Sequence, residues 1–342
     1  MGRRICQLLS HSIESYDQMR LYHSIGHEVF DIGGYIDPRS PHDPKRPALP
    51  EVQFYPDLKQ AVDDLGTDDN LRVAQEHIPD KVLEWADTIV MHHYLERMVG
   101  DWPRLRDWLR GDKQRRIIWR TVGQSAEGNE AMMAPLRAEG LERVAYSPKE
   151  ANIPGYCGHD AIIRFYKNPS EWDGWTGEWP GVINITQHLR QRDPYTNWGF
   201  WEAATQGLRR EALGPGSEAI GGPGELSFDK MRDWLRHARC YVYVGTQPAS
   251  YTLGLIEALM TGTPTFSIGP SHMKVFPYGP LLFEGHEIAG LGSDDPGEVN
   301  AMVKECLAFP AHARRISETQ RARAIELFGM DTIAAQWREY LA

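Results

Sequence analysis

Residues 241–269 constrain the fold more than any other stretch, because a strand, a turn and a helix follow one another directly. The apolar run Tyr241–Val244 predicts a buried strand, and a polar turn then leads into an apolar-periodic helix. The turn Gly262–Pro264 begins a second short strand. This order is typical of parallel α/β proteins, in which the helix N-terminus presents backbone N–H groups at the carboxyl edge of the sheet.

The turn and the helix start have side chains that suit an anionic ligand such as a diphosphate. Among Pro248, Ala249, Ser250 and Thr252 there are two small hydroxyls and no bulky side chain to block a diphosphate. Glu257, about one turn into the helix, could accept a hydrogen bond from a ribose hydroxyl. We take five candidates from this segment: Gly245, Ser250, Tyr251, Thr252 and Glu257. The alternative is an ordinary α/β unit in which Glu257 is merely a solvated carboxylate.

Alternating apolar runs and helical patterns continue through both halves of the chain and predict an α/β protein with two parallel-sheet domains and a cleft between them. A stretch rich in turn residues and tryptophan, 167–181, marks the break between the halves. We place the domains at 1–170 and 178–328. A last helix occupies 329–342, with Asp331 as its N-cap.

Composition narrows the possible partners. A net charge of −10 over 342 residues argues against a generic nucleic-acid or anionic-membrane surface. No run of 18 apolar residues occurs, so we expect no transmembrane helix. The four cysteines lack metal-ligand spacing and predict free thiols in a reducing cytoplasm, with no zinc site. The sequence leaves the oligomeric state open.

One local basic stretch, residues 104–116, could still follow a nucleic-acid backbone. It carries six cations and is interleaved with Trp102 and Trp108. In an acidic protein, its helical spacing favours a solvated helix face instead.

Histidines follow two predicted strands of the first half. His92 and His93 end the strand 88–91, and only one of them can point into the cleft because strand residues alternate faces. His11 follows the first strand, where an imidazole that titrates near neutrality could deprotonate an acceptor hydroxyl. Glu14 or Asp17 could orient it. Each histidine could equally be a structural or surface residue.

Arginines and glycines end three further strands. Arg120 could clamp an acceptor or a phosphate, or it could pair with Asp87. Arg190 and Arg192 follow the strand 182–186 and are cations available for a diphosphate. Gly214 and Gly216 form a turn after the next short strand.

Taken together, these segments resemble the GT-B glycosyltransferases, and family 4 in particular. The donor helix of that family reads Glu, seven residues, Glu-Ala-Met, then Gly-x-Pro. Here 257–260 and 262–264 match, whereas the first Glu of the family falls on Ala249. The family's Ala-Asp-x-x-x-x-His motif matches the region 86–93 and implies a sugar contact by His92 or His93, with His93 slightly favoured.

The resemblance implies two Rossmann-like domains facing a cleft, with the donor on the second and the final helix crossing back to the first. It implies sugar transfer from a nucleoside diphosphate sugar, UDP-linked by expectation, to an acceptor hydroxyl. No metal or other cofactor is expected, so Arg190 and Arg192 would stabilise the leaving phosphate. Gly214 and Gly216 lie where the family contacts the base. Retention of configuration is favoured, while the absent first Glu and the candidate base His11 leave inversion open.

The acceptor is not specified by the sequence. One candidate is DNA bearing 5-hydroxymethylpyrimidine, because phage base glucosyltransferases share this fold and the stretch 104–116 could track a backbone. Others are a glycan, a lipid or a protein. The alternative function is a non-catalytic sugar-nucleotide-binding protein of the same fold.

Overall fold

The computed structural model describes residues 2–8, 12–33, 35–40, 46–65, 77–92, 95–122, 127–247, 249–272 and 291–342. The chain divides into two compact units. Unit 1 comprises Met1–Ile163 and Ala334–Ala342, and unit 2 comprises Arg164–Ile333. Unit 2 therefore begins before the turn-rich stretch in which the sequence placed the boundary.

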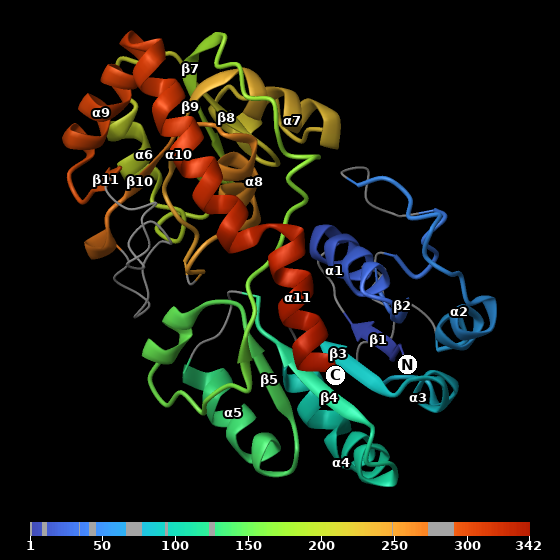
Figure 1. Cartoon of the computed structure of the whole chain (residues 1–342). Coiled ribbons are helices and arrows are strands. Elements are labelled where there is room, and N and C mark those ends of the chain that lie inside the picture. Colours follow the sequence, from blue (N-terminus) through green and yellow to red (C-terminus); the bar gives the residue numbers. More distant parts are fainter. Residues whose placement is uncertain are drawn as a thin grey trace. The chain divides into compact units, whose positions relative to one another are not determined.

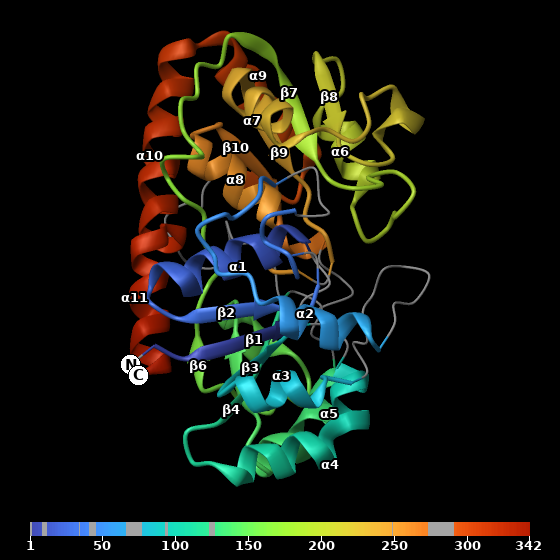
Figure 2. The ribbon, with the colours of Figure 1, turned by 90° about the vertical axis from the view of Figure 1, so that its right-hand side faces the viewer.

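Unit 1 contains a parallel sheet of six strands in the order β2-β1-β3-β4-β5-β6. Figure 1 labels β1 to β5, and Figure 2 also labels β6. In chain order the strands are β1 (Arg4–Leu8), β2 (Glu28–Asp31), β3 (Thr88–Met91), β4 (Arg116–Arg120), β5 (Glu142–Ala145) and β6 (Ala161–Ile162). Strand β6 has only two residues.

Successive strand residues point to opposite faces of this sheet, and helices pack on both faces. Cys6 and Leu8 belong to the core that also contains apolar side chains of α2 (Pro56–Asp63), α3 (Asp80–Trp85), α4 (Leu95–Gly111) and α5 (Glu127–Ala138). Gln7, between them, faces the other way, and its Nε2 donates to Ser15 O of α1 (Ser12–Ser24) at 3.0 Å. Figure 2 shows α1 and α3 on opposite sides of β1.

The last helix, α11 (Met330–Leu341), contributes its final turns to unit 1. Trp337 is fully buried, and its ring meets the edge of the Tyr22 ring at 5.1 Å. Two arginines cap the helix end: Arg3 Nε donates to Leu341 O at 2.7 Å, and Arg116 Nη1 to Tyr340 O at 2.7 Å. The helix begins at Met330, so the prediction that Asp331 is its N-cap is wrong; Asp331 lies in the first turn.

Unit 2 contains five parallel strands in the order β11-β10-β9-β7-β8. In chain order they are β7 (Trp179–Ile185), β8 (Arg210–Leu213), β9 (Ala238–Tyr243), β10 (Thr265–Ile268) and β11 (Gly292–Ser293). Helices α6 (Trp198–Ala204) and α9 (Pro296–Ala308) pack together, and α8 (Leu253–Thr261) contacts both α7 (Phe228–His237) and α10 (Pro310–Phe328). In Figure 1, α9 and α7 lie on opposite sides of this sheet.

The two helix-covered parallel sheets confirm the predicted α/β fold class. None of the helices in the described part of the chain is long and apolar enough to cross a membrane.

Candidate functional site

The loops after β7 and β8 are joined at the carboxyl edge of the unit 2 sheet, where open α/β sheets bind ligands. The backbone N–H of His188, after β7, donates to Pro215 O, after β8, at 2.7 Å. Gln191 Nε2 donates to Gly216 O at 2.9 Å. The candidates Arg190 and Gly216 therefore lie in one hydrogen-bonded loop pair.

The loops after β9 and β10 belong to the same edge. Asn197 Nδ2, at the start of α6, donates to Val244 O at 2.8 Å, and Gln247 N donates to Tyr195 O at 2.8 Å. Gln247 Nε2 also donates to His272 O, after β10, at 3.0 Å. Gln247 thus connects the loops after β7, β9 and β10. The sequence did not point to this role, because the partners Tyr195 and His272 are both far from Gln247 in the chain.

Two of the candidate glycines are required by backbone geometry. Gly214 has φ +100° and Gly216 has φ +81°, a region that favours glycine. A Cβ at Gly216 would also clash with the imidazole of His188 and lie 3.0 Å from its Cα. Gly216 therefore permits the close approach of the β7 and β8 loops.

The helix α8 begins beside the end of β7. Thr252 is its N-cap, and its Oγ1 accepts from Leu255 N at 3.3 Å. A Cβ built on Gly254 would lie 3.4 Å from Ile185 O, so the first turn packs directly on the strand end. The first turn of a helix leaves backbone N–H groups without intrahelical partners, and these favour anions. Gly245, at the exit from β9, is buried with φ +76°.

The candidate cations are exposed. Arg190 and Arg192 both lie on the protein surface in the loop after β7, and the guanidinium of Arg190 is 6.0 Å from the ring centre of Trp198. Their charges are accessible to a ligand at this edge.

Three candidates at the start of α8 and within it are buried, namely Ser250, Tyr251 and Glu257. Ser250 is fully covered, and Tyr251 Oη accepts from Phe165 N at 3.3 Å while its ring packs against Phe165. Glu257 is 2% exposed, and its Oε1 lies 2.9 Å from Lys167 Nζ. The alternative that Glu257 is a solvated carboxylate is therefore wrong, and Lys167 is a partner that the sequence analysis had assigned to a linker.

In unit 1, only some of the candidate histidines can be placed. His11 and His93 lie outside the described residues. His92 is 2% exposed, and its backbone N–H donates to Leu8 O at 3.0 Å, at the ends of β3 and β1. The side chains of Glu14 and Asp17 are also buried in α1.

Arg120 is fully buried at the end of β4, with its guanidinium 5.8 Å from the ring centre of Trp337. Asp87, considered as its partner, instead accepts from Arg4 N at 2.9 Å and lies 3.8 Å from Arg3. Arg120 therefore contacts the final helix.

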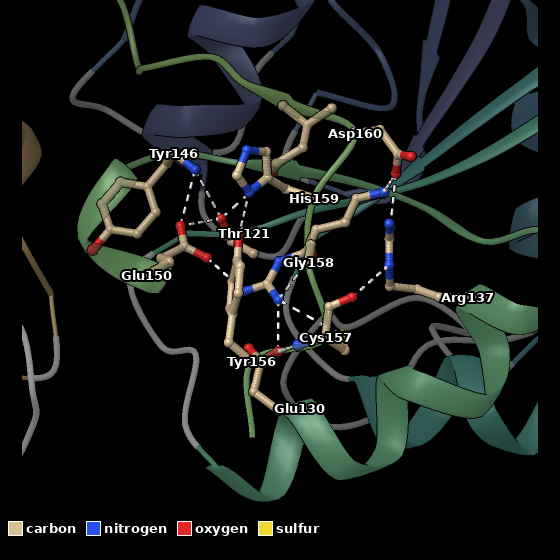
Figure 3. Close-up of polar contacts among 12 residues, drawn as sticks. Thr121, Glu130, Arg137, Tyr146, Glu150, Tyr156, Cys157, Gly158, His159 and Asp160 are labelled. Atoms are coloured by element: carbon tan, nitrogen blue, oxygen red, sulfur yellow. Dashed lines mark hydrogen bonds and ion pairs between the residues drawn. The ribbon is translucent and has the colours of Figure 1, made fainter. Parts of the chain in front are cut away.

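A buried ion-pair network fixes the carboxyl ends of β4 and β5 (Figure 3). Arg143, Glu130 and Glu150 all have fully buried side chains, with Arg143 nitrogens 2.7 Å from Glu130 Oε2 and 2.8 Å from Glu150 Oε2. Burial alone lowers the pKa of Arg143, but the two carboxylates outweigh it and raise this pKa. Glu150 Oε1 also accepts from Thr121 Oγ1 at 2.6 Å and from Tyr146 N at 3.0 Å.

The basic stretch 104–116 is not an open basic track. Carboxylates neutralise half of its cations, in the pairs Arg104 with Asp101 and Asp80, Arg106 with Glu139, and Arg116 with Glu142. Trp102 and Trp108 are buried, and their indole N–H groups donate to Glu139 and to Leu83 O. The tryptophans are therefore core residues of unit 1 and do not present stacking faces.

The described residues contain neither a metal-binding cluster nor a disulfide. No group of three or more His, Cys, Asp or Glu side chains there could hold a metal ion. All four cysteines are free, and three of them are buried.

The sequence matches no protein-family model and no curated protein. The structure, in contrast, is similar to solved structures along their whole length. A glycosyltransferase from Rickettsia africae ESF-5 superposes with a TM-score of 0.66 at 10% identity, covering 99% of this chain and 98% of that one. Anabaena Alr3699/HepE, in complex with UDP and glucose, gives a TM-score of 0.64 at 12% identity, covering 99% of both chains.

A third similar structure is an α-glucosyltransferase in complex with UDP and a 13-mer DNA containing an HMU base, with a TM-score of 0.51 at 13% identity and full coverage of both chains. Identities this low establish the fold alone, so membership of family 4 stays a prediction. The chain has the GT-B fold of these glycosyltransferases over its full length.

Proposed function

We propose that this protein is a glycosyltransferase that moves a sugar from a nucleoside diphosphate sugar, UDP-linked, to an acceptor hydroxyl. The observation that carries the proposal is the carboxyl edge of unit 2. Four strand-end loops are hydrogen-bonded together there, beside the N-terminus of α8 and the exposed Arg190 and Arg192. HepE, which has the same fold, is described with UDP and glucose bound.

The diphosphate would lie against the first turn of α8, where N–H groups and the helix dipole favour negative charge. Arg190 and Arg192 would neutralise the charge that develops on the leaving phosphate, a role that needs no metal ion. Gly214 and Gly216 would border the base. The Thr252 side chain caps the helix that receives the phosphates.

On the acceptor side we propose a sugar contact by His92 or His93 and an acceptor or phosphate contact by Arg120, with His11 as the candidate base of an inverting reaction. We favour retention. The anomeric configuration of the product, read by NMR coupling constants, decides between the two outcomes. The free thiols favour a reducing compartment such as the cytoplasm.

A ligand screen tests the donor. Thermal unfolding is followed with UDP, UDP-glucose, UDP-N-acetylglucosamine and other nucleoside diphosphate sugars, with wild type and an Arg190→Ala/Arg192→Ala variant side by side. A donor at a hundredfold excess over Kd stabilises the protein by about 2.7 kcal/mol. Donor hydrolysis distinguishes an enzyme from a non-catalytic binder, since only the enzyme releases UDP. No stabilisation by any donor would overturn the proposal.

For the acceptor, DNA bearing 5-hydroxymethylpyrimidine is one candidate, favoured by the HMU-containing DNA in the α-glucosyltransferase structure. The net charge and the stretch 104–116, half of whose cations are paired with carboxylates, weigh against it, and a glycan is the other candidate. The test incubates hydroxymethylated DNA with the donor found above, digests the DNA and weighs the nucleosides. No mass increase with a donor that is hydrolysed would exclude DNA and leave a glycan, a lipid or a protein.

A further inference from the structure

Lys167 lies where the chain enters unit 2, next to the segment through which it leaves. Its backbone N–H donates to Phe328 O at 2.9 Å, and it forms an isolated parallel bridge with Gly329. The chain passes between the units at 163/164 and again at 333/334. Within unit 2, the entry segment 164–167 and the exit segment 328–333 are therefore hydrogen-bonded to each other.

The segment proposed to bind the donor is attached to both of these crossover segments. Lys167 Nζ lies 2.9 Å from Glu257 Oε1, in the second turn of α8. Tyr251, just before the helix, accepts from Phe165 N at 3.3 Å, and its ring centre is 5.4 Å from that of Phe328. The helix and the turn before it are thus fixed to the entry and exit of the unit.

The Lys167–Glu257 ion pair is shielded from solvent. The side chains are 1% and 3% exposed, and the ammonium also lies 5.8 Å from the ring centre of Trp172. Removing one partner takes away the countercharge that the other has at 2.9 Å, which is strongly destabilising, whereas well-packed apolar residues of similar volume are often as stable as the ion pair. Stability alone therefore does not require charges here.

We propose that Lys167 is a positioning residue of the sugar-nucleotide site. It holds the Glu257 carboxylate and, together with the Tyr251 contact, couples α8 to the crossover segments 164–167 and 328–333. Binding at the start of α8 then restrains the two places where the chain passes between the units. This inference rests on the proposed function, because it requires a nucleotide at α8.

The experiment separates stability from binding with paired variants of the full chain. Lys167→Met and Glu257→Gln each leave one buried charge, and each is expected to lower the unfolding midpoint. The double variant removes both charges and is expected to recover most of that loss. Its affinity for UDP, the probe, is nevertheless expected to stay at least about tenfold below wild type by calorimetry, the order of a lost charged hydrogen bond.

Two further variants complete the design. Lys167→Arg keeps the charge and is expected to restore UDP binding. Glu202→Gln breaks a partly exposed pair with Arg210 in the same unit (2.6 Å) and is expected to leave UDP binding unchanged. Hydrogen exchange gives an independent readout: UDP is expected to slow exchange in 164–167 and 328–333 of wild type and to slow it less in the double variant.

The outcomes are distinct. If wild type binds neither UDP nor any UDP-sugar, the proposed function fails and this inference fails with it. If wild type binds UDP and the stable double variant binds it equally well, only the positioning role of Lys167 is overturned. Exchange in 164–167 and 328–333 that does not respond to bound UDP overturns the coupling.

Discussion

Arg143→Met is expected to lower the free energy of unfolding by about 3–5 kcal/mol. The substitution keeps an unbranched apolar stem and removes the guanidinium that lies 2.7 Å from Glu130 and 2.8 Å from Glu150. Both carboxylates have fully buried side chains, so they would be left in the core without their countercharge. The large cost comes from leaving two buried carboxylates without their countercharge. The intact network itself adds little to the free energy of unfolding compared with well-packed apolar residues.

The measurement is urea unfolding of full-length protein, followed by tryptophan fluorescence and circular dichroism. Because the chain has two units, coincidence of the two probes has to be checked before a single free energy is extracted. Arg137→Met is the matched control. Its partner Asp160 is also 2.7 Å away, but the two side chains are 18% and 38% exposed, so the expected cost stays below about 1 kcal/mol.

A cost for Arg143→Met no larger than that for Arg137→Met would refute the reasoning from burial. Adding Glu130→Gln and Glu150→Gln to Arg143→Met should recover part of the loss, since the two buried carboxylate charges are then removed. A functional effect is expected as well, because Glu150 also accepts from Thr121 at the end of β4. A displaced loop there should change the acceptor KM more than the donor KM.

Three further predictions concern the donor edge and one buried acid. Arg190→Ala and Arg192→Ala should each lower kcat by on the order of 100-fold without changing the unfolding midpoint, and EDTA should leave the rate of UDP release unchanged; strict dependence on added Mg²⁺ or Mn²⁺ would contradict this chemistry. Gly216→Ala should cost about 1–3 kcal/mol in urea unfolding and raise the donor KM, whereas Gly214→Ala, with φ +100° but open space at the Cβ position, should change KM less. Burial raises the pKa of Asp31 to about 6, against hydrogen bonds from Tyr35 N–H and Ser15, so folded protein binds this proton more tightly than unfolded protein. The unfolding free energy should therefore fall by about 3 kcal/mol from this group as pH rises from about 4 to above 6. Asp31→Asn should remove that fall, and an identical pH profile for variant and wild type would exclude Asp31 as its source.

The sequence predicted those helices and strands that have a clear hydrophobic pattern of their own. Thr88–Met91 occurs with the predicted bounds, because an apolar run is readable without knowing its neighbours. Helix α5, Glu127–Ala138, was missed because Gly128 and Pro135 look like helix breakers. Met133 and Leu136 pack into the unit 1 core beside α4, and this tertiary contact outweighs the weak local propensity.

In the candidate site too, residues with a local sequence signal were predicted, and residues that depend on tertiary contacts were not. Gly214 and Gly216 were recognisable, since the turn Gly214–Gly216 is a local signal and φ values of +100° and +81° favour glycine. Lys167 and Glu130 were not recognised, because isolated charged residues in a sequence look solvent-exposed. Only the folded chain brings Lys167 to Glu257 and Glu130 to Arg143, and burial converts these charges into structural partners.

The arginine-capped end of α11 has a consequence for biosynthesis. Arg3 and its acceptor Leu341 are 338 residues apart, and the pocket that receives Trp337 belongs to the part of unit 1 that is translated first. The 170 residues of unit 2 are made in between. At typical synthesis rates this takes roughly ten to thirty seconds, during which the Tyr22 ring lacks its contact with Trp337. The contacts of Trp337 and Leu341 with the first segment of unit 1 can therefore form only after unit 2 has been synthesised.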